Sequence, residues 1–170
     1  MAVGAVNQMK VLPLRIASAL ACALLAACTP PPPDLSGVDL SQVNCQPGDL
    51  PSTLNAGAII TELPEGAPAE MVRYHTALFE DLQLTYQSFF CSIAVYKDVA
   101  AAEGAFETAC AQMGLTLASP TTVGDESCHT EPQGIVSVLF RRGTAVVLIQ
   151  ADFDGSGVSK AASAVDGRLK

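Results

Sequence analysis

Two runs of mostly β-branched and other apolar residues, 135–140 and 145–149, flank the short polar segment Arg141-Arg142-Gly143-Thr144. Runs of this composition favour extended strands, and a short polar link between two of them is typical of a β-hairpin. Gly143 can take the positive φ that such a turn needs, and the two arginines keep the tip of the hairpin in water. The chain is therefore predicted to build an antiparallel sheet against which its other segments pack.

A further strand and a helix are predicted just before this hairpin. Residues 87–96 are predicted to form a strand, in which successive side chains point to opposite faces of the sheet. One face would carry Phe89, Cys91, Ile93 and Val95, and the other Ser88, Phe90, Ser92, Ala94 and Tyr96. Asp98 then has the side chain of a helix N-cap, and Gly114 supplies the left-handed residue that commonly ends a helix. The apolar residues between them recur at three- and four-residue steps and form one stripe: Val99, Ala102, Phe106, Ala109 and Met113.

The remaining elements carry weaker patterns. Residues 58–61 favour a short strand, and residues 68–81 are interpreted as a first helix with Met71, Val72, Leu78 and Phe79 on its apolar side. Gly124 is predicted to turn the chain into another strand. A last helix starts at Ser156 or Ser159 and turns Val158, Ala161, Ala162, Val165 and Leu169 inward. The predicted fold class is α+β, an antiparallel sheet with helices packed on one face.

The N-terminal part of the chain has a different character. Lys10 and Arg15 are the only charged residues before Cys28, and residues 16–27 carry no charge. This apolar stretch is too short for a membrane-spanning helix, which needs about 20 residues, but it suits a secretory signal peptide. It ends in Leu25-Ala26-Ala27-Cys28, with small residues directly before the cysteine.

These four residues resemble the lipobox of bacterial lipoproteins. The resemblance implies a signal peptide over residues 1–27, removal of that peptide, and lipid such as palmitate on Cys28. The mature chain is then expected to be anchored to a membrane by its lipid, extracytoplasmic, on an outer membrane or the cell surface. The alternative is an ordinary secretory signal cut after an A-x-A site, with Cys28 incidental.

Residues 28–48 are interpreted as a lipid-anchored linker. Four consecutive prolines, Pro30 to Pro33, lack backbone donors and favour a stiff polyproline II spacer rather than helix or sheet. The remaining residues, 49–170, are enough for a single domain with its own core.

The mature chain has four cysteines available for disulfide bonds. Of six cysteines, Cys22 leaves with the signal peptide and Cys28 takes the lipid. Paired cysteines are typical of exported domains, so two disulfides are expected among the remaining four. Three pairings are open, and we favour Cys45–Cys91 with Cys110–Cys128; the alternative is free, buried thiols.

Charge excludes some partners. All 17 acidic residues follow Cys28, together with seven of the nine basic residues, so the chain from Cys28 onward has a formal charge of −10. A surface this acidic repels nucleic acid and anionic headgroups. The membrane is therefore expected to be contacted through the lipid on Cys28, with an envelope protein or a small molecule as a further partner and no nucleic acid.

Candidate functional residues are few. Asp152 and Asp154 precede a glycine as in the start of a calcium loop, but the glutamate that would complete the loop is missing, so no metal is predicted and these two remain weak candidates. Arg141 and Arg142 are weak candidates for gripping an acidic group on a partner. No catalytic residue and no cofactor is predicted, because the sequence contains none of the common nucleophile, zinc or phosphate-loop motifs.

The hypothesis favoured by these features is a binding or accessory module of the cell envelope, more consistent with a non-enzyme than with an enzyme. An envelope hydrolase with an unrecognised active site and a purely structural envelope protein are the alternatives. A concave pocket with perturbed titratable groups would favour an enzyme or a small-molecule binder, and an exposed apolar surface would favour a protein partner.

Overall fold

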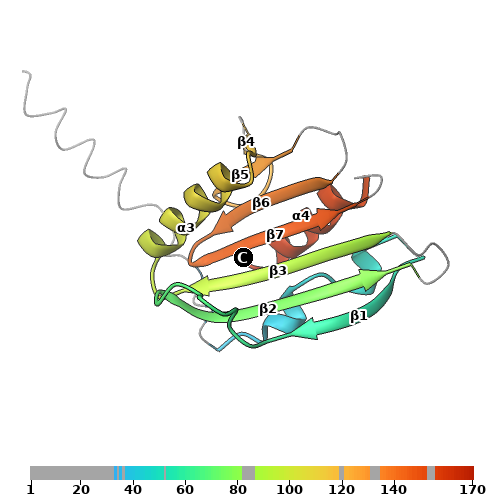
Figure 1. The fold of residues 1–170 in the computed structure, drawn as a ribbon, viewed down its shortest axis with the longest axis horizontal. Helices are drawn as coiled ribbons and strands as arrows, with labels where there is room; N and C mark the ends of the chain where they lie inside the picture. Colours follow the sequence, from blue (N-terminus) through green and yellow to red (C-terminus); the bar gives the residue numbers. More distant parts are fainter. Residues whose placement is uncertain are drawn as a thin grey trace, which may run out of the picture. The chain divides into compact units, whose positions relative to one another are not determined.

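The computed structural model describes residues 33, 35, 37–51, 53–81, 87–118, 121–130, 135–152 and 156–170. The predicted signal peptide 1–27, Cys28 and Asp154 lie outside these residues. Within them the chain folds as the predicted α+β domain with an antiparallel sheet (Figure 1). None of the described helices has the length and hydropathy needed to span a bilayer.

The sheet of the described part has seven strands in the order β1-β2-β3-β7-β6-β5-β4, each antiparallel to its neighbours. The strands are β1 (Asn55–Ile60), β2 (Met71–Glu80), β3 (Ser88–Tyr96), β4 (Thr116–Leu117), β5 (Glu126–His129), β6 (Val136–Arg142) and β7 (Ala145–Ala151). The helices are α2 (Leu40–Val43), α3 (Val99–Gln112) and α4 (Ser156–Arg168), with the 3₁₀ turn η2 (Pro47–Asp49).

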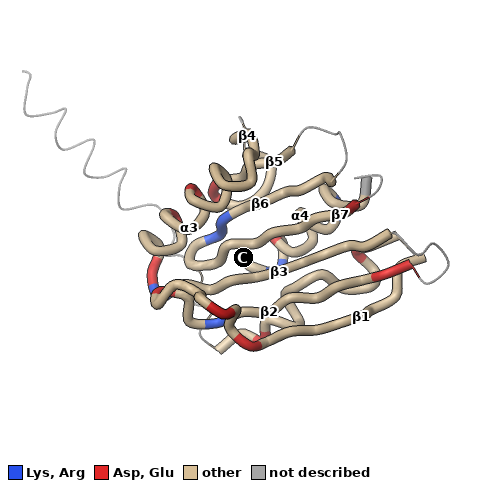
Figure 2. Tube along the Cα trace, in the orientation of Figure 1, with Lys and Arg blue, Asp and Glu red and all other residues tan. Residues whose placement is uncertain are grey.

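Most of the predicted elements near the hairpin are confirmed. β6 and β7 pair through a turn in which Gly143 has a φ of 56°, and Gly124, with a φ of 70°, leads into β5. Asp98 caps α3 by accepting a hydrogen bond from the backbone N–H of Ala101 at 2.8 Å. Gly114 ends that helical segment with a φ of 64°. Figure 2 shows no charged residue along β3 or β7, the strands at the centre of the sheet.

The helices lie on both faces of the sheet, and not on one face as predicted. Along β3, Cys91 and Ile93 belong to the same core cluster as α4, while Ala94 and Tyr96 belong to a second cluster with α3. Figure 1 shows α3 in front of the sheet and α4 behind it. The reason is that β3 and β7 are apolar on both faces, so each face needs a cover to remove it from water.

The predicted helix over residues 68–81 is wrong, because residues 71–80 form β2. This strand is hydrogen-bonded to β1 on one side and to β3 on the other. Ala77 and Phe79 point into the core that α4 covers, and His75 is buried on the same face. A polar histidine and a threonine, both buried, hide the alternation that would have identified the strand.

The folded domain begins before the predicted linker boundary at residue 48. Leu35, Leu40, Val43 and Cys45 are all buried in the core that α4 covers. Arg168 of α4 closes over this segment, donating hydrogen bonds to the carbonyl oxygens of Val43 at 3.2 Å and Asn44 at 2.9 Å. The expected linker therefore contributes core residues and one short helix.

The first predicted disulfide is confirmed, and the second is not formed. Cys45 and Cys91 are bridged, which ties the N-terminal segment to the central strand β3. Cys110 and Cys128 are free and buried, with their thiols hydrogen-bonded. Burial first, and then the hydrogen bond to Cys110, raise the pKa of the Cys128 thiol. The Cys128 sulfur is thus held away from the thiolate form that attacks to make a disulfide.

Candidate functional site

Helix α3 covers only one end of its face of the sheet. Its buried residues Ala102, Phe106 and Cys110 pack in a cluster with Ala94 and Tyr96 of β3, Val146 of β7 and Leu139 of β6. The opposite end of the same face has no helix over it among the described residues. We call this uncovered part the open face; it consists of Leu78, Ser88, Phe90, Ile135, Gln150 and Asp152.

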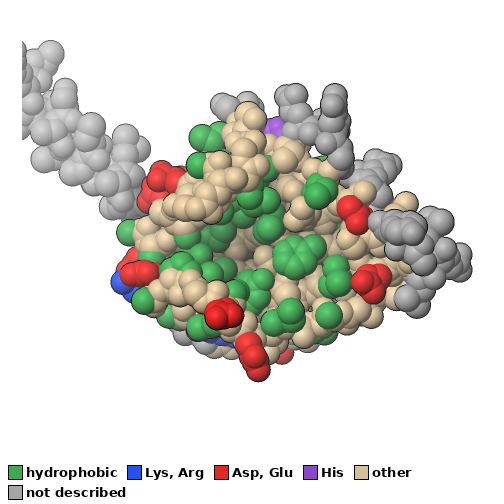
Figure 3. All heavy atoms as spheres, in the orientation of Figure 1, with side chains coloured by type: hydrophobic (Ala, Val, Ile, Leu, Met, Phe, Trp, Pro, Cys, Tyr) green, Lys and Arg blue, Asp and Glu red, His purple; other side chains and the backbone are tan. Residues whose placement is uncertain are grey.

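The register of the strands brings the open face together from distant parts of the chain. Leu78 of β2 lies opposite Phe90 of β3, and Phe90 lies opposite Gln150 of β7. Leu78 and Phe90 are only half-buried, and 53% of the surface of Ile135 is exposed. Figure 3 shows apolar side chains gathered over this side of the molecule, which is hollowed beside α3. An aliphatic and aromatic surface in contact with water is a typical place for another molecule to bind.

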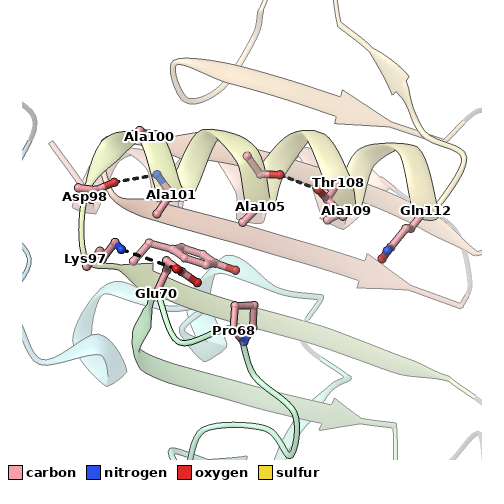
Figure 4. Close-up of a pocket in the computed structure, with 12 residues that line it drawn as sticks. Pro68, Glu70, Lys97, Asp98, Ala100, Ala101, Ala105, Thr108, Ala109 and Gln112 are labelled. Atoms are coloured by element: carbon pink, nitrogen blue, oxygen red, sulfur yellow. Dashed lines mark hydrogen bonds and ion pairs between the residues drawn. The ribbon is translucent and has the colours of Figure 1, made fainter.

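A groove runs along the flank of α3 on the same side of the molecule. It encloses about 720 Å³ and is bounded on one side by small side chains of the helix, including Ala101, Ala105 and Ala109 (Figure 4). Pro68 and Glu70 lie on the other side. Because alanine side chains are short, a bound segment could approach the helix backbone closely here.

The charged groups at the end of the groove already interact with one another. The ammonium of Lys97 lies 3.6 Å from the Glu70 carboxylate, and both side chains are about half exposed. Asp98 is occupied as the N-cap of α3. Burial raises the pKa of the Tyr96 phenol, which keeps that group neutral. The groove therefore offers an apolar contact surface with a neutralised charged rim.

Arg141 and Arg142 are not available to grip a partner in the way the sequence suggested. The Arg141 guanidinium is buried and lies 3.2 Å from Asp125 and 3.4 Å from Glu126. Arg142 lies 2.8 Å from Asp125 and 2.6 Å from Asp166 of α4. Both arginines hold the hairpin, the β5 entry and α4 together, which is a structural role.

Asp152 also has a structural role in the described part. Its carboxylate accepts hydrogen bonds from the backbone N–H of Ser88 at 2.6 Å and from the Ser88 hydroxyl at 2.8 Å. These contacts fasten the end of β7 to the start of β3. No group of three or more metal-ligating side chains occurs among the described residues, and Asp154 lies outside them.

A buried polar pair under α2 was not predicted. Asn44 accepts from the backbone N–H of Cys45 at 2.8 Å, and its amide nitrogen donates to the Cys91 carbonyl at 3.1 Å. This fixes the orientation of the amide, so the same nitrogen also donates to Nδ1 of His75 at 2.8 Å. Nδ1 is then an acceptor, and the proton of the neutral imidazole is on Nε2, a buried atom without a hydrogen-bond partner in the structure.

The stability of the domain is expected to decrease below neutral pH because of His75. Burial lowers the pKa of His75 below its ordinary value near 6.5, and the carboxylate of Asp39 offsets this only in part. As the pH falls, the imidazole is therefore protonated at a higher pH in the unfolded chain than in the folded chain. The neutral imidazole of His75 therefore contributes to the free energy of unfolding in full above about pH 6.5. This contribution is lost as the pH falls toward the folded-state pKa, and the free energy of unfolding then decreases by at most about 1.4 kcal/mol per pH unit.

Urea unfolding of the chain between pH 5 and 8 measures this slope. His75→Gln keeps an acceptor for Asn44 but does not titrate, so its unfolding should depend less on pH than that of the wild type. His129→Gln removes the other histidine and is the matched control. An equal flattening by both substitutions would contradict the assignment to His75.

The open face could have been anticipated only in part. The alternation over residues 87–96 places Phe90 and Tyr96 in the same set of side chains, and so on the same face of the strand. Leu78 was missed because it was assigned to a helix. Asn44 was missed because its segment was interpreted as a linker.

In comparisons with protein families, curated proteins and solved structures, no family model matches the chain and no protein or structure is significantly similar to it.

Proposed function

We propose that this chain is a lipid-anchored, extracytoplasmic binding or accessory module of the cell envelope, and that it holds a protein partner on the open face. The observation that carries the proposal is the open face beyond the end of α3, where Leu78, Phe90 and Ile135 are in contact with water. Covering apolar side chains of this kind by a partner is favourable by about 25 cal/mol per Å² of apolar surface removed from water.

The shape of the open face favours a protein over a small molecule. Its hollow holds about 270 Å³, below the range of roughly 300–1,000 Å³ that is usual for small-molecule sites. The neighbouring groove along α3 has a volume within that range, about 720 Å³, but the small side chains along its helical wall suit a polypeptide segment lying along the helix. Together the two surfaces offer a broad, mainly apolar area, as in the core of a protein interface.

The anchor part of the proposal is supported by Leu25-Ala26-Ala27-Cys28 and the proline run that follows it. A spacer of this kind would hold the domain away from the lipid headgroups while keeping it at the membrane. The disulfide between Cys45 and Cys91 is consistent with an oxidising compartment outside the cytoplasm.

Site-specific photocrosslinking in intact cells tests the proposal. A benzophenone amino acid at position 90 is expected to form an adduct with an envelope protein, because the native side chain there is already aromatic. Adding Leu78→Lys should suppress this adduct, since a charge would then lie in the apolar contact. The same label at Glu103, an exposed position on α3, is the control and should give little adduct.

Membrane association of the chain is measured in the same cells, and it tests the lipid anchor. The wild-type chain should sediment with membranes, and Cys28→Ala should move to the soluble fraction. Equal labelling from positions 90 and 103 would argue against the open face as the binding surface. A Cys28→Ala chain that stays with the membranes would argue against the lipid anchor, whatever the crosslinking result.

A further inference from the structure

Strand β1 forms one edge of the described sheet and is unusually exposed. All six of its residues, Asn55 to Ile60, are solvent-exposed, and among the described strands only β2 pairs with it. Ile59 is 61% exposed and Ile60 51% exposed. Ile59 lies opposite Ala77 and Ile60 opposite Thr76, so the two isoleucines point to different faces of the sheet.

Strands at the edge of a sheet carry unpaired backbone groups, and proteins normally protect them by charge, proline or brevity. The other edge, β4, is only two residues long. By contrast, residues 50–61 contain no charged side chain, and β1 itself contains no proline. A register shift between Ala56 and Ile59, as in a β-bulge, is a protective feature of this edge. Figure 2 shows the β1 trace without a charged position.

Apolar side chains next to the strand extend the exposed surface. Leu63, in the segment that follows β1, is 48% exposed, and Val72, at the start of β2, is 50% exposed. Both lie with Ile59 around a hollow beside α2. A partner strand added at this edge would therefore find backbone groups to pair with and apolar side chains to cover.

We infer that the partner at this edge is a second copy of the same chain, paired through two β1 strands in antiparallel orientation. Charge distinguishes this occupant from others. The chain carries 17 acidic residues, yet residues 50–61 have none, so the two paired strands would themselves bring no carboxylate to the seam. Antiparallel pairing about a two-fold axis also makes one surface complementary to itself.

The nearest acidic residues fit this arrangement. Glu62 follows β1, and in an antiparallel pair centred on the strand the two Glu62 residues lie at opposite ends, about 30 Å apart at 3.3–3.4 Å per residue. Glu80 pairs with Asn55 from β2, and its carboxylate reaches over β1, with Oε2 3.6 Å from the position that a Cβ would take at Gly57. Repulsion between such carboxylates is weakened by salt, so the pairing should become tighter as ionic strength rises.

A membrane surface fits this edge less well. Glu62, Glu65 and Glu70 follow β1 within ten residues of its end and would be repelled by anionic headgroups. A basic protein strand is the remaining occupant, and it would bind more weakly, not more tightly, as salt increases.

Co-capture of two differently tagged full-length chains tests the inference. Both are expressed together and extracted in detergent, and one tag is used for purification. The second tag should be retained with the wild type, and more strongly at higher salt. Ile60→Lys in both copies should reduce its retention at least about tenfold, because it places two like charges at the paired edge.

Leu117→Lys is the matched control. Leu117 is a 65% exposed apolar residue on the opposite edge strand, so the substitution is chemically equivalent but lies away from β1. Both variants have the same anchor, so sharing of a detergent micelle affects them equally. Failure to retain the second tag, equal retention by Ile60→Lys and the wild type, or weaker retention at higher salt would each overturn the inference.

Hydrogen exchange adds a readout at the strand itself. The amides of residues 55–60 should exchange more slowly as the concentration of the wild-type chain rises, and this change should be absent in Ile60→Lys. Protection that does not depend on concentration would also overturn the pairing of two β1 strands. Crosslinking at Phe90 on the open face is independent of these results, so the failure of either proposal can be recognised separately.

Discussion

Replacing both Cys45 and Cys91 with alanine is expected to lower the free energy of unfolding by about 4 kcal/mol. The bridge joins residues 46 positions apart, and the chain-entropy argument gives this magnitude for a loop of that length. It is a large fraction of the 5–15 kcal/mol that stabilises a typical domain. Urea unfolding without reductant, followed by circular dichroism, measures the difference, and adding reductant to the wild type should bring it close to the variant.

The other two cysteines provide the control for this experiment. Cys110→Ala removes a buried thiol that is not bridged, so it should cost much less and should be insensitive to reductant. If the wild type and the doubly substituted chain unfold at the same urea concentration, the bridge does not stabilise the domain.

Phe106→Ala should be the most damaging single substitution on the α3 side of the sheet, at about 3–5 kcal/mol. The ring is 1% exposed and is the largest side chain that α3 contributes to its cluster with β3, β6 and β7. Its neighbours Ala94 and Ala102 are small, so they cannot fill the cavity left behind. The free energy of unfolding from urea titration measures the loss.

Met113→Ala is the matched control for Phe106→Ala. Met113 belongs to the same predicted apolar stripe, but 37% of its surface is exposed at the end of α3. Its truncation should cost well under half as much. Comparable losses for the two substitutions would show that α3 is not held mainly by its central ring.

The sequence was most informative where one local pattern determined the outcome. The hairpin, the strand over residues 87–96 and the two long helices each rest on a short-range signal such as alternation, an N-cap or a glycine. Gly143, Gly124 and Gly114 all adopt the positive φ that their places in the sequence suggested. The inward residues of the last helix, from Val158 to Leu169, are likewise buried.

The errors occurred where tertiary contacts decide the structure. β2 became a strand because β1 and β3 provide hydrogen bonds on both sides, and its buried His75 is made tolerable by Asn44, 31 residues earlier. No local pattern contains that contact. For the same reason the N-terminal segment resembled a linker, although Leu35 and Leu40 are held by the core.

The candidate site was harder to predict than the fold. The open face is the part of the sheet that α3 leaves uncovered. Its extent depends on the length of α3 and on where α3 packs on the folded sheet, and no local sequence pattern contains that information. The arginines of the hairpin were identifiable as a pair. Their carboxylate partners are Asp125, in the turn before β5, and Asp166 of α4, and these come close to the arginines only in the folded chain.

The Cys45–Cys91 bridge also determines how a mechanical load enters the domain. A pull on the chain from its N-terminal side reaches Cys45 after only a few core residues and passes through the disulfide to β3. β3 pairs along its length with β2 on one side and with β7 on the other, so the load enters an interior strand of the sheet instead of an edge strand. If the chain is tethered through its N-terminal side, as proposed above, tension therefore reaches the interior of the sheet first.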